Sequence, residues 1–215
     1  MSEAKRRGAV RLRGAEANLE DAEWMGRQAV AKRRVAKGYR HPALDLRLRT
    51  DRTRDEAALL AAARQAGVPV PVVYDVDREG ATLVLERVPG PTLRQALEAD
   101  GDAVALRRLA TLGGLVARLH AAGITHGDLT TSNVLVPDPA DADRLVLLDF
   151  GLGAASGDAE AQGVDLHLVE EALEATDARA ARLFGAFLDD YRATFPGHAE
   201  ATRRLEEIRE RGRYR

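Results

Sequence analysis

The sequence predicts an α+β fold of two lobes, with a strand-rich lobe at residues 1–89 and a helical lobe at residues 90–215. Short apolar runs of strand length fill the first part of the chain, whereas apolar residues at helical spacing dominate the second. The run Pro89-Gly90-Pro91 separates the two patterns, and such a run is typical of a hinge. A chain of 215 residues, 45% hydrophobic and 31% charged, can bury a core in such a fold.

The N-terminal lobe is expected to contain five strands and one long helix. The helix is predicted at residues 50–66, because Leu59, Leu60 and Ala63 share one face and Gly67 follows as a C′ glycine. The strands are predicted at residues 9–12, 18–24, 27–31, 70–76 and 82–88.

The helical lobe is expected to begin with a short helix, for which Thr92 and Gln95 supply a capping box. Two apolar runs, at residues 134–136 and 145–148, predict a β-hairpin in the middle of this lobe. Gly123 ends the longest of the predicted helices. The helices are predicted at residues 102–122, 163–175, 177–193 and 199–211.

Composition excludes several classes of protein. The absence of cysteine excludes disulfides, thiolate metal sites and a cysteine nucleophile. No run approaches the roughly 20 apolar residues of a membrane span, and the charged N-terminus lacks the apolar core of a secretory signal. We therefore expect a cytoplasmic protein with no membrane association.

The net charge of −2 conceals two basic segments. Residues 27–54 carry ten basic residues and only two acids, Asp45 and Asp51, and residues 203–215 carry six arginines. Basic stripes of this kind attract the phosphate backbone of a nucleic acid. Solvated helix faces, balanced by acids elsewhere in the fold, would have the same composition.

Two motifs carry the strongest functional signal. The first is His-Gly-Asp-Leu-Thr-Thr-Ser-Asn at residues 126–133, and the second is Leu-Leu-Asp-Phe-Gly at residues 147–151. In this order they suit phosphoryl transfer from ATP: Asp128 would orient the attacking hydroxyl or water, while Asn133 and Asp149 would hold Mg²⁺. The alternative is a polar turn followed by a hairpin whose aspartates only cap loops.

A lysine near the end of a predicted strand adds a third feature. Only three of the 32 basic residues are lysines, so Lys32 after an apolar run suggests a need for a compact ammonium that binds phosphates. Such a lysine needs a carboxylate to position it. Glu56 is the best candidate, with Glu16 as a rival, and a surface salt bridge is the alternative role for Glu56.

The base and phosphates of ATP would require further residues. The apolar side chains of Val30 and Leu135 are expected to enclose the adenine, and backbone groups near Glu86 and Val88 to bind its edge. The residues assigned to nucleotide binding, including the loop with a single glycine, are Gly14, Glu16, Val30, Lys32, Glu86, Val88 and Leu135.

These motifs together resemble one family, the small RIO-like atypical protein kinases that serve as the ATPase/kinase subunit of the KEOPS complex. The resemblance rests on residues 14–17, 32–42, 44–45, 52–57, 67–71, 126–133, 149–151, 164–166 and 211–214. It implies a bilobal protein-kinase-like fold, Mg²⁺ and ATP as cofactors, and serine/threonine kinase and ATPase activity. It also implies partners: the tRNA threonylcarbamoyl-transferase subunit, the small KEOPS subunits, and tRNA bound through the basic N-lobe segment and tail.

The chain departs from ordinary protein kinases in two places. Gly127 stands where those kinases have an arginine, and residues 152–163 are short and lack Ala-Pro-Glu. We therefore expect constitutive geometry rather than a phosphorylation switch. Many family members have Glu-Asp-Lys-Ala where this chain has residues 160–163, which affects a partner contact rather than ATP binding. The resemblance gives Asp165 a supporting role beneath the catalytic loop.

Two other functions are compatible with the motifs. The first is a non-catalytic scaffold of the same complex that binds nucleotide and tRNA. It is disfavoured because a scaffold does not need Lys32, Glu56, Asp128, Asn133 and Asp149 together. The second is a small-molecule phosphotransferase of the aminoglycoside type, which shares His-Gly-Asp. The short helical lobe after Asn133 leaves little room for such a substrate.

Overall fold

The computed structural model describes residues 5–13 and 16–213. Gly14, assigned to the nucleotide site, lies outside the described residues, as do Tyr214 and Arg215 of the basic tail. The chain divides into two compact units. Unit 1 comprises the described residues up to Ala61 together with Pro71–Val88, and unit 2 comprises Ala62–Val70 with the described residues from Pro89 onward.

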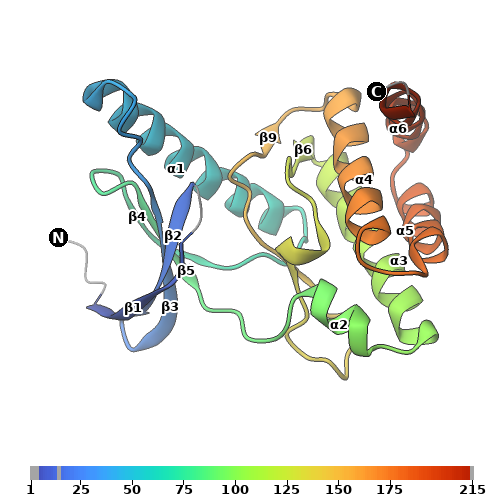
Figure 1. Ribbon diagram of the computed structural model, residues 1–215, viewed down its shortest axis with the longest axis horizontal. Helices are drawn as coiled ribbons and strands as arrows, with labels where there is room; N and C mark the ends of the chain where they lie inside the picture. The colour runs from blue at the N-terminus through green and yellow to red at the C-terminus, as the bar shows by residue number, and fades with distance from the viewer. Residues whose placement is uncertain (1–4, 14–15, 214–215) are drawn as a thin grey trace. The chain divides into compact units, whose positions relative to one another are not determined.

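Unit 1 contains a five-stranded antiparallel sheet in the order β1-β2-β3-β5-β4 (Figure 1). Met25 and Gly26 join β2 to β3 with positive φ angles of 47° and 81°, as a two-residue hairpin of the primed type requires. The strands are β1 Lys5–Arg13, β2 Ala17–Trp24, β3 Arg27–Arg34, β4 Val73–Asp77 and β5 Thr82–Glu86.

The core of this sheet is small. Its buried cluster consists of three alanines and a valine, with Trp24 and Tyr74 packed against it. Strand β3 pairs with β2 on one side and β5 on the other, so its residues are held at both edges. Lys32 and Arg34 are two residues apart on β3 and therefore face the same side of the sheet, and both are buried.

Helix α1 spans Pro42–Gln65 and so begins earlier than the predicted residue 50. Pro42 stands in its first turn, where the missing N–H costs no hydrogen bond. The prediction missed this part because the leucines of its first turns are exposed and form no buried stripe. The predicted C-terminal glycine is confirmed: Gly67 has φ +76°, and Val68 N–H donates to Ala63 O at 3.0 Å.

Two strands of unit 1 are shorter than predicted. β4 begins at Val73 rather than at residue 70, and β5 ends at Glu86 rather than at residue 88. Val72 lies just outside β4, where its N–H donates to the side chain of Glu86 and its carbonyl accepts from the Glu86 N–H. A polar side chain therefore takes the place of a ladder hydrogen bond where β4 begins.

Unit 2 is mainly helical (Figure 1). The Thr92–Gln95 capping box is confirmed, and the β-hairpin predicted between residues 134 and 148 is present. The helices are α2 Leu93–Ala99, α3 Asp102–Ala121, α4 Ala159–Glu174, α5 Ala180–Thr194 and α6 His198–Arg213. The short strand pairs are β7 Val134–Leu135 with β8 Val146–Leu147, and β6 Ile124–Thr125 with β9 Ala154–Ala155; the second pair was not predicted.

Glycines set the distance between the helices of unit 2. A Cβ on Gly113 of α3 would overlap the carbonyl of Phe187 on α5, and one on Gly163 of α4 would meet Arg204 of α6. Helix α4 begins at Ala159, before the predicted residue 163, because Asp158 caps it by accepting the N–H of Glu160 at 3.1 Å. Within the described part of the chain, each helix is too short or too polar to cross a bilayer.

Candidate functional site

In unit 1, Lys32 and Glu56 form the ion pair that the sequence predicts. Lys32 Nζ lies 2.7 Å from Glu56 Oε1, and both side chains are buried. Arg34 Nη2 lies 2.6 Å from Glu56 Oε2, so one buried carboxylate binds two cations. The sequence reasoning missed Arg34, although the two-residue period of a strand puts it on the same face as Lys32. The rival acid Glu16 binds Arg52 at 2.7 Å.

The other residues assigned to the nucleotide lie in ordinary strand and loop positions. Val30 is half-buried and pairs with Leu85 across β3 and β5. The carboxylate of Glu86 is occupied with the backbone of β4, as described above. Val88 is half-buried and is the last residue of unit 1. In unit 2, Leu135 is half-buried and forms an antiparallel bridge with Thr92.

In unit 2, Asn133 and Asp128 are in direct contact. The Nδ2 of Asn133 donates to the backbone carbonyl of Asp128 at 2.8 Å and to its Oδ2 at 2.9 Å. A short 3₁₀ helix, Thr131–Asn133, sets the backbone of this loop. Because the amide nitrogen of Asn133 binds Asp128, its amide oxygen points away from Asp128 and can coordinate a cation.

The backbone next brings Asp149 beside this loop. Leu148 N–H donates to the carbonyl of Asn133 at 2.8 Å, so the residue after Leu148 is a near neighbour of Asn133. Asp149 has φ +58°, a left-handed conformation that aspartate tolerates better than most residues. Its Oδ1 accepts the N–H of Gly151 at 3.1 Å. Strained backbone of this kind is concentrated at functional sites.

Asp165 on α4 holds the loop from behind. Its Oδ2 accepts the N–H of His126 at 2.6 Å, and its Oδ1 accepts the N–H of Gly127 at 2.7 Å. His120 Nε2 also donates to Oδ2 at 3.2 Å, and His120 Nδ1 lies 2.8 Å from the hydroxyl of Tyr191. The supporting role predicted for Asp165 is confirmed. The contributions of His120 and Tyr191 were missed, because they come from helices distant in sequence.

His126 is neutral in this arrangement. Its Nε2 donates to the carbonyl of Leu148 at 2.8 Å, and its Nδ1 accepts the N–H of Asp128 at 3.3 Å. Burial lowers the pKa of His126, although the nearby carboxylates, Asp165 first among them, act in the opposite direction. The ring also packs on buried Phe150, with centroids 4.6 Å apart.

Gly127 is required by the backbone. Its φ is +78°, and a Cβ there would overlap the carbonyl oxygen of Leu152. The position after His126 therefore has no room for the arginine that ordinary protein kinases place there.

The donor set of this loop suits Mg²⁺. An amide oxygen from Asn133 and a carboxylate from Asp149 are the hard oxygen ligands that this ion prefers. Among residues 5–13 and 16–213, no three histidine, aspartate or glutamate side chains gather around a common point.

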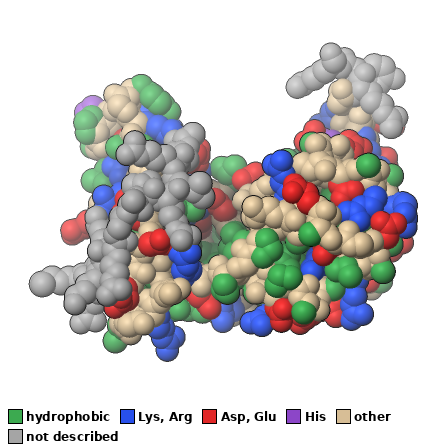
Figure 2. All heavy atoms as spheres, turned by 60° about the horizontal axis from the view of Figure 1, so that its bottom comes forward, with side chains coloured by type: hydrophobic (Ala, Val, Ile, Leu, Met, Phe, Trp, Pro, Cys, Tyr) green, Lys and Arg blue, Asp and Glu red, His purple; other side chains and the backbone are tan. Residues whose placement is uncertain are grey.

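The arginines of the tail helix α6 bind acids of unit 2. Arg209 is bidentate to Glu170, and Arg211 Nη2 lies 2.6 Å from Glu160. Arg203 and Arg204 both bind Glu200 and Glu207 on their own helix. Figure 2 shows the same intermixing, with blue and red side chains next to one another over the helical unit. As far as Arg211, the positive charge predicted for the tail is thus compensated within the fold.

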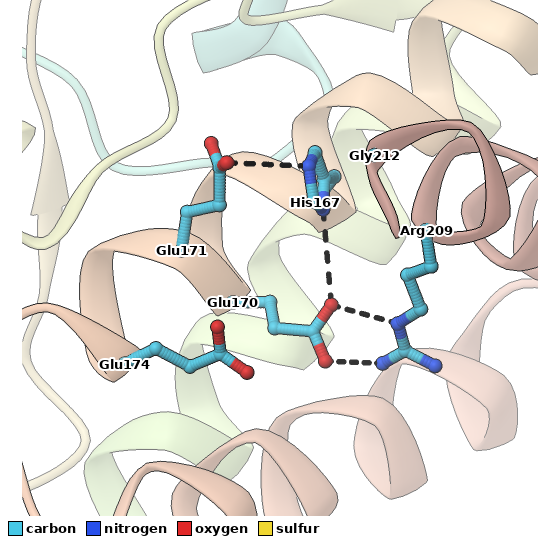
Figure 3. A pocket seen from close by; sticks show the side chains of 6 residues that line it. All are labelled: His167, Glu170, Glu171, Glu174, Arg209 and Gly212. Atoms are coloured by element: carbon cyan, nitrogen blue, oxygen red, sulfur yellow. Dashed lines mark hydrogen bonds and ion pairs between the residues drawn. The ribbon is translucent and has the colours of Figure 1, made fainter. Parts of the chain in front are cut away.

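Helices α4 and α6 also enclose a polar pocket of about 510 Å³. Figure 3 shows His167 between two glutamates of its own helix, Glu170 and Glu171, at 3.8 and 3.4 Å. Arg209 reaches Glu170 from the opposite helix, and Glu174 lies at the edge of the pocket. This pocket could not be predicted from the sequence, because it depends on how α6 lies against α4.

Comparison with known proteins gives matches over most of the chain. The sequence model of the lipopolysaccharide kinase (Kdo/WaaP) family matches residues 1–186. The chain is 38% identical over 208 residues to EKC/KEOPS complex subunit Tp53rkb of Mus musculus, covering 94% of this chain and 85% of that protein. It is 45% identical over 202 residues to a probable bifunctional tRNA threonylcarbamoyladenosine biosynthesis protein of Methanoculleus marisnigri. That match covers 94% of this chain but only 35% of the relative, so the chain spans about a third of such bifunctional proteins.

Two solved structures share the fold. A complex of Rio2 kinase with ADP/Mg²⁺ and phosphoaspartate, from Chaetomium thermophilum, superposes with a TM-score of 0.65 at 18% identity, covering 98% of this chain and 72% of that one. A complex of WaaP with acyl carrier protein gives 0.63 at 17% identity, covering 96% and 89%. The predicted kinase-like fold is thereby confirmed. With these matches, the chain belongs to the lipopolysaccharide kinase (Kdo/WaaP) family and to the family of the EKC/KEOPS complex subunit Tp53rkb.

Proposed function

We propose that the protein is a Mg-ATP-dependent ATPase and serine/threonine kinase that acts as the ATPase subunit of a cytoplasmic KEOPS complex in tRNA threonylcarbamoyladenosine modification. Two relatives support this role: the mouse relative is an EKC/KEOPS complex subunit, and the relative from Methanoculleus marisnigri is a probable bifunctional tRNA threonylcarbamoyladenosine biosynthesis protein. In this role its partners are the tRNA threonylcarbamoyl-transferase subunit, the small KEOPS subunits and tRNA.

The proposed reaction assigns a role to each residue of the candidate site. Lys32 binds the phosphates of ATP, and Glu56 positions its ammonium. Asp128 orients the hydroxyl or water that attacks the γ-phosphate. The two hydrogen bonds from Asn133 to Asp128 fix the distance between these residues. Asn133 and Asp149 hold Mg²⁺, which neutralises the charge of the triphosphate when bound. The base contacts are assigned to Val30, Glu86, Val88 and Leu135, and the loop contacts to Gly14 and Glu16.

The buried Lys32–Glu56 ion pair is the observation that most strongly supports the proposed function. Taking two charged groups out of water is costly, and an apolar pair of similar size is often as stable. A lysine buried in this way, in a chain whose other basic residues are nearly all arginines, therefore indicates a role beyond stability.

The direct test is ATP hydrolysis by the purified chain. We expect Mg²⁺-dependent turnover in the wild type and a loss of at least a hundredfold in Asp149→Ala, with unfolding by urea unchanged within about 1 kcal/mol. Asp189→Ala is the matched control, because the Asp189 side chain is 82% exposed on α5. Equal turnover in wild type and Asp149→Ala would refute the enzyme and favour the non-catalytic scaffold.

The role in tRNA modification needs a separate experiment. The chain is mixed with its transferase subunit, tRNA, ATP and the threonylcarbamoyl donor, and the modified nucleoside is measured. We expect modification to depend on the chain and to fall in Asp149→Ala. Modification that proceeds equally without the chain would remove the KEOPS assignment but leave ATP hydrolysis untouched.

A further inference from the structure

A tight turn before helix α1 presents an aromatic ring among basic side chains. Arg40 N–H donates to the carbonyl of Lys37 at 3.0 Å and closes the turn that carries Tyr39. The Tyr39 side chain is 79% exposed, one of the most exposed large hydrophobic residues in the described part of the chain. Figure 2 shows hydrophobic and basic side chains side by side at the upper left, where α1 begins.

The buried Asp45 fixes the shape of this turn. Its Oδ1 accepts the N–H of Lys37 at 3.2 Å, and its Oδ2 accepts from Arg49 at 2.7 Å. Arg40 Nη1 lies 3.7 Å from Oδ1 of the same carboxylate. The hydrogen bond from Arg49 is the main reason that the pKa of Asp45 is lowered, so the carboxylate stays charged. The contacts of Asp45 therefore hold the turn that carries Tyr39 in one conformation.

One face of the Tyr39 ring is already used by a cation. The guanidinium carbon of Arg40 lies 5.3 Å from the ring centroid, within the range of a cation–π contact. Because most of the ring is exposed, its opposite face is open. A planar ring with one open face and a guanidinium on the other is the kind of platform on which a nucleobase stacks.

The surroundings of the turn favour an anion. A shallow hollow next to it is lined by five cations, one carboxylate and two apolar side chains: Arg34, Lys37, Arg40, Arg49, Arg52, Glu16, Val35 and Leu48. Within the described residues, Glu16 binds Arg52, Asp45 binds Arg49, and Glu56 binds Arg34. The hollow holds only about 20 Å³, which is too little for a side chain. A ligand must therefore be bound at the surface, as a phosphate backbone is.

We infer that this turn is a binding site for a single-stranded stretch of RNA. An unpaired base stacks on the open face of Tyr39, and the flanking phosphates lie against Lys37, Arg40 and Arg49. The inference rests on the proposed function, since the unpaired nucleotides of tRNA are then the natural ligand. It assigns the stacking contact with an unpaired base to the ring of Tyr39. An acidic protein surface is disfavoured, because it would use the charges but would have no need of an open aromatic face.

The test is binding of a fluorescent 12-nucleotide single-stranded RNA of mixed sequence to the full chain at several salt concentrations. We expect Tyr39→Ala to weaken binding about tenfold and Tyr39→Phe to retain it. The salt dependence in Tyr39→Ala should be unchanged, because no phosphate contact is lost. Arg40→Gln should instead lower the salt slope by about 0.7. Met25→Ala is the control, since Met25 is also exposed and lies in the same unit.

Each other result would overturn the inference. Wild-type RNA binding in Tyr39→Ala would show that the ring takes no part. Full binding in Tyr39→Leu would indicate an apolar contact with a protein rather than base stacking. Equal affinity for the same sequence as a duplex would show that unpaired bases are not recognised. The ATPase test does not involve Tyr39, so normal hydrolysis with no RNA effect would remove this site and leave the proposed enzyme.

Discussion

Arg34 binds the carboxylate of Glu56 at 2.6 Å, on the oxygen opposite the one that Lys32 binds. The side chains of all three residues are at least nine-tenths buried. Glu56 therefore neutralises the ammonium of Lys32 and the guanidinium of Arg34 at once. Arg34 also donates to the carbonyl of Arg52 at 3.3 Å. This hydrogen bond joins the end of β3 to α1 and does not involve Lys32.

This arrangement predicts unequal costs for removing the two partners of the ion pair. Glu56→Gln removes the negative charge that two buried cations share and should lower the free energy of unfolding by about 3 kcal/mol. Lys32→Met leaves Glu56 paired with Arg34 and should cost less than about 1.5 kcal/mol. Urea unfolding of the two variants measures both values. Equal losses would show that Arg34 does not compensate Glu56, and ATP turnover should be lost in both variants if the proposed function holds.

Gly127 offers a second prediction with a control inside the same unit. Gly127→Ala combines a left-handed backbone with overlap of the Leu152 carbonyl. Gly123→Ala has a similar φ of +70° but open space around its Cβ. The control should therefore cost about 1 kcal/mol, for strain alone, and Gly127→Ala at least about 1 kcal/mol more. Thermal or urea unfolding compares them, and equal losses would mean that the loop of Leu152 moves aside without cost.

Local signals allowed much of the fold to be predicted from the sequence. The capping box at Thr92 and the C′ glycine at Gly67 each depend on residues within a few positions of one another, and both are confirmed. The start of α1 at Pro42 was missed because its first leucines are exposed, so there was no apolar stripe to recognise. The pairing of β6 with β9 was missed because strands of two residues leave no periodic pattern.

For the candidate site, the sequence allowed two contacts to be predicted, but not those that depend on tertiary packing. The pair of Lys32 with Glu56 and the support from Asp165 followed from a motif and a resemblance, and the structure has both. That Arg34 shares Glu56 depends on packing between β3 and α1. The compensation of tail arginines, such as Arg209 by Glu170, depends on how α6 lies against α4, and charge counting along the chain cannot reveal it.

Tyr191 should matter for the stability of the loop at residues 126–133 although it lies on α5. Burial, aided by the charge of Asp165, raises the pKa of Tyr191 well above its usual value, so the hydroxyl keeps its proton. His120 Nε2 donates to Asp165, and the hydroxyl of Tyr191 is the hydrogen-bond partner of Nδ1 at 2.8 Å. Tyr191→Phe leaves the buried Nδ1 without this partner and should cost about 1–2 kcal/mol in urea unfolding. The ¹⁵N chemical shift of His120 Nδ1 should change because this nitrogen loses its hydrogen-bond partner, whereas Tyr39→Phe should change neither quantity.

His126 should make the protein less stable below neutral pH. Burial lowers its pKa in the native state, whereas the unfolded chain takes up a proton near pH 6.5. As the pH falls through 6.5, the unfolded state therefore gains protons that the native state cannot bind, and stability is lost by up to about 1.4 kcal/mol per pH unit. Urea midpoints between pH 5 and 8 measure this slope. His126→Gln can still donate to Leu148 but cannot titrate, so its slope between pH 5 and 6.5 should be shallower, while His41→Gln, at an exposed position, should retain the wild-type slope. A wild-type slope in His126→Gln would mean that His126 takes up its proton as readily in the native state as in the unfolded chain.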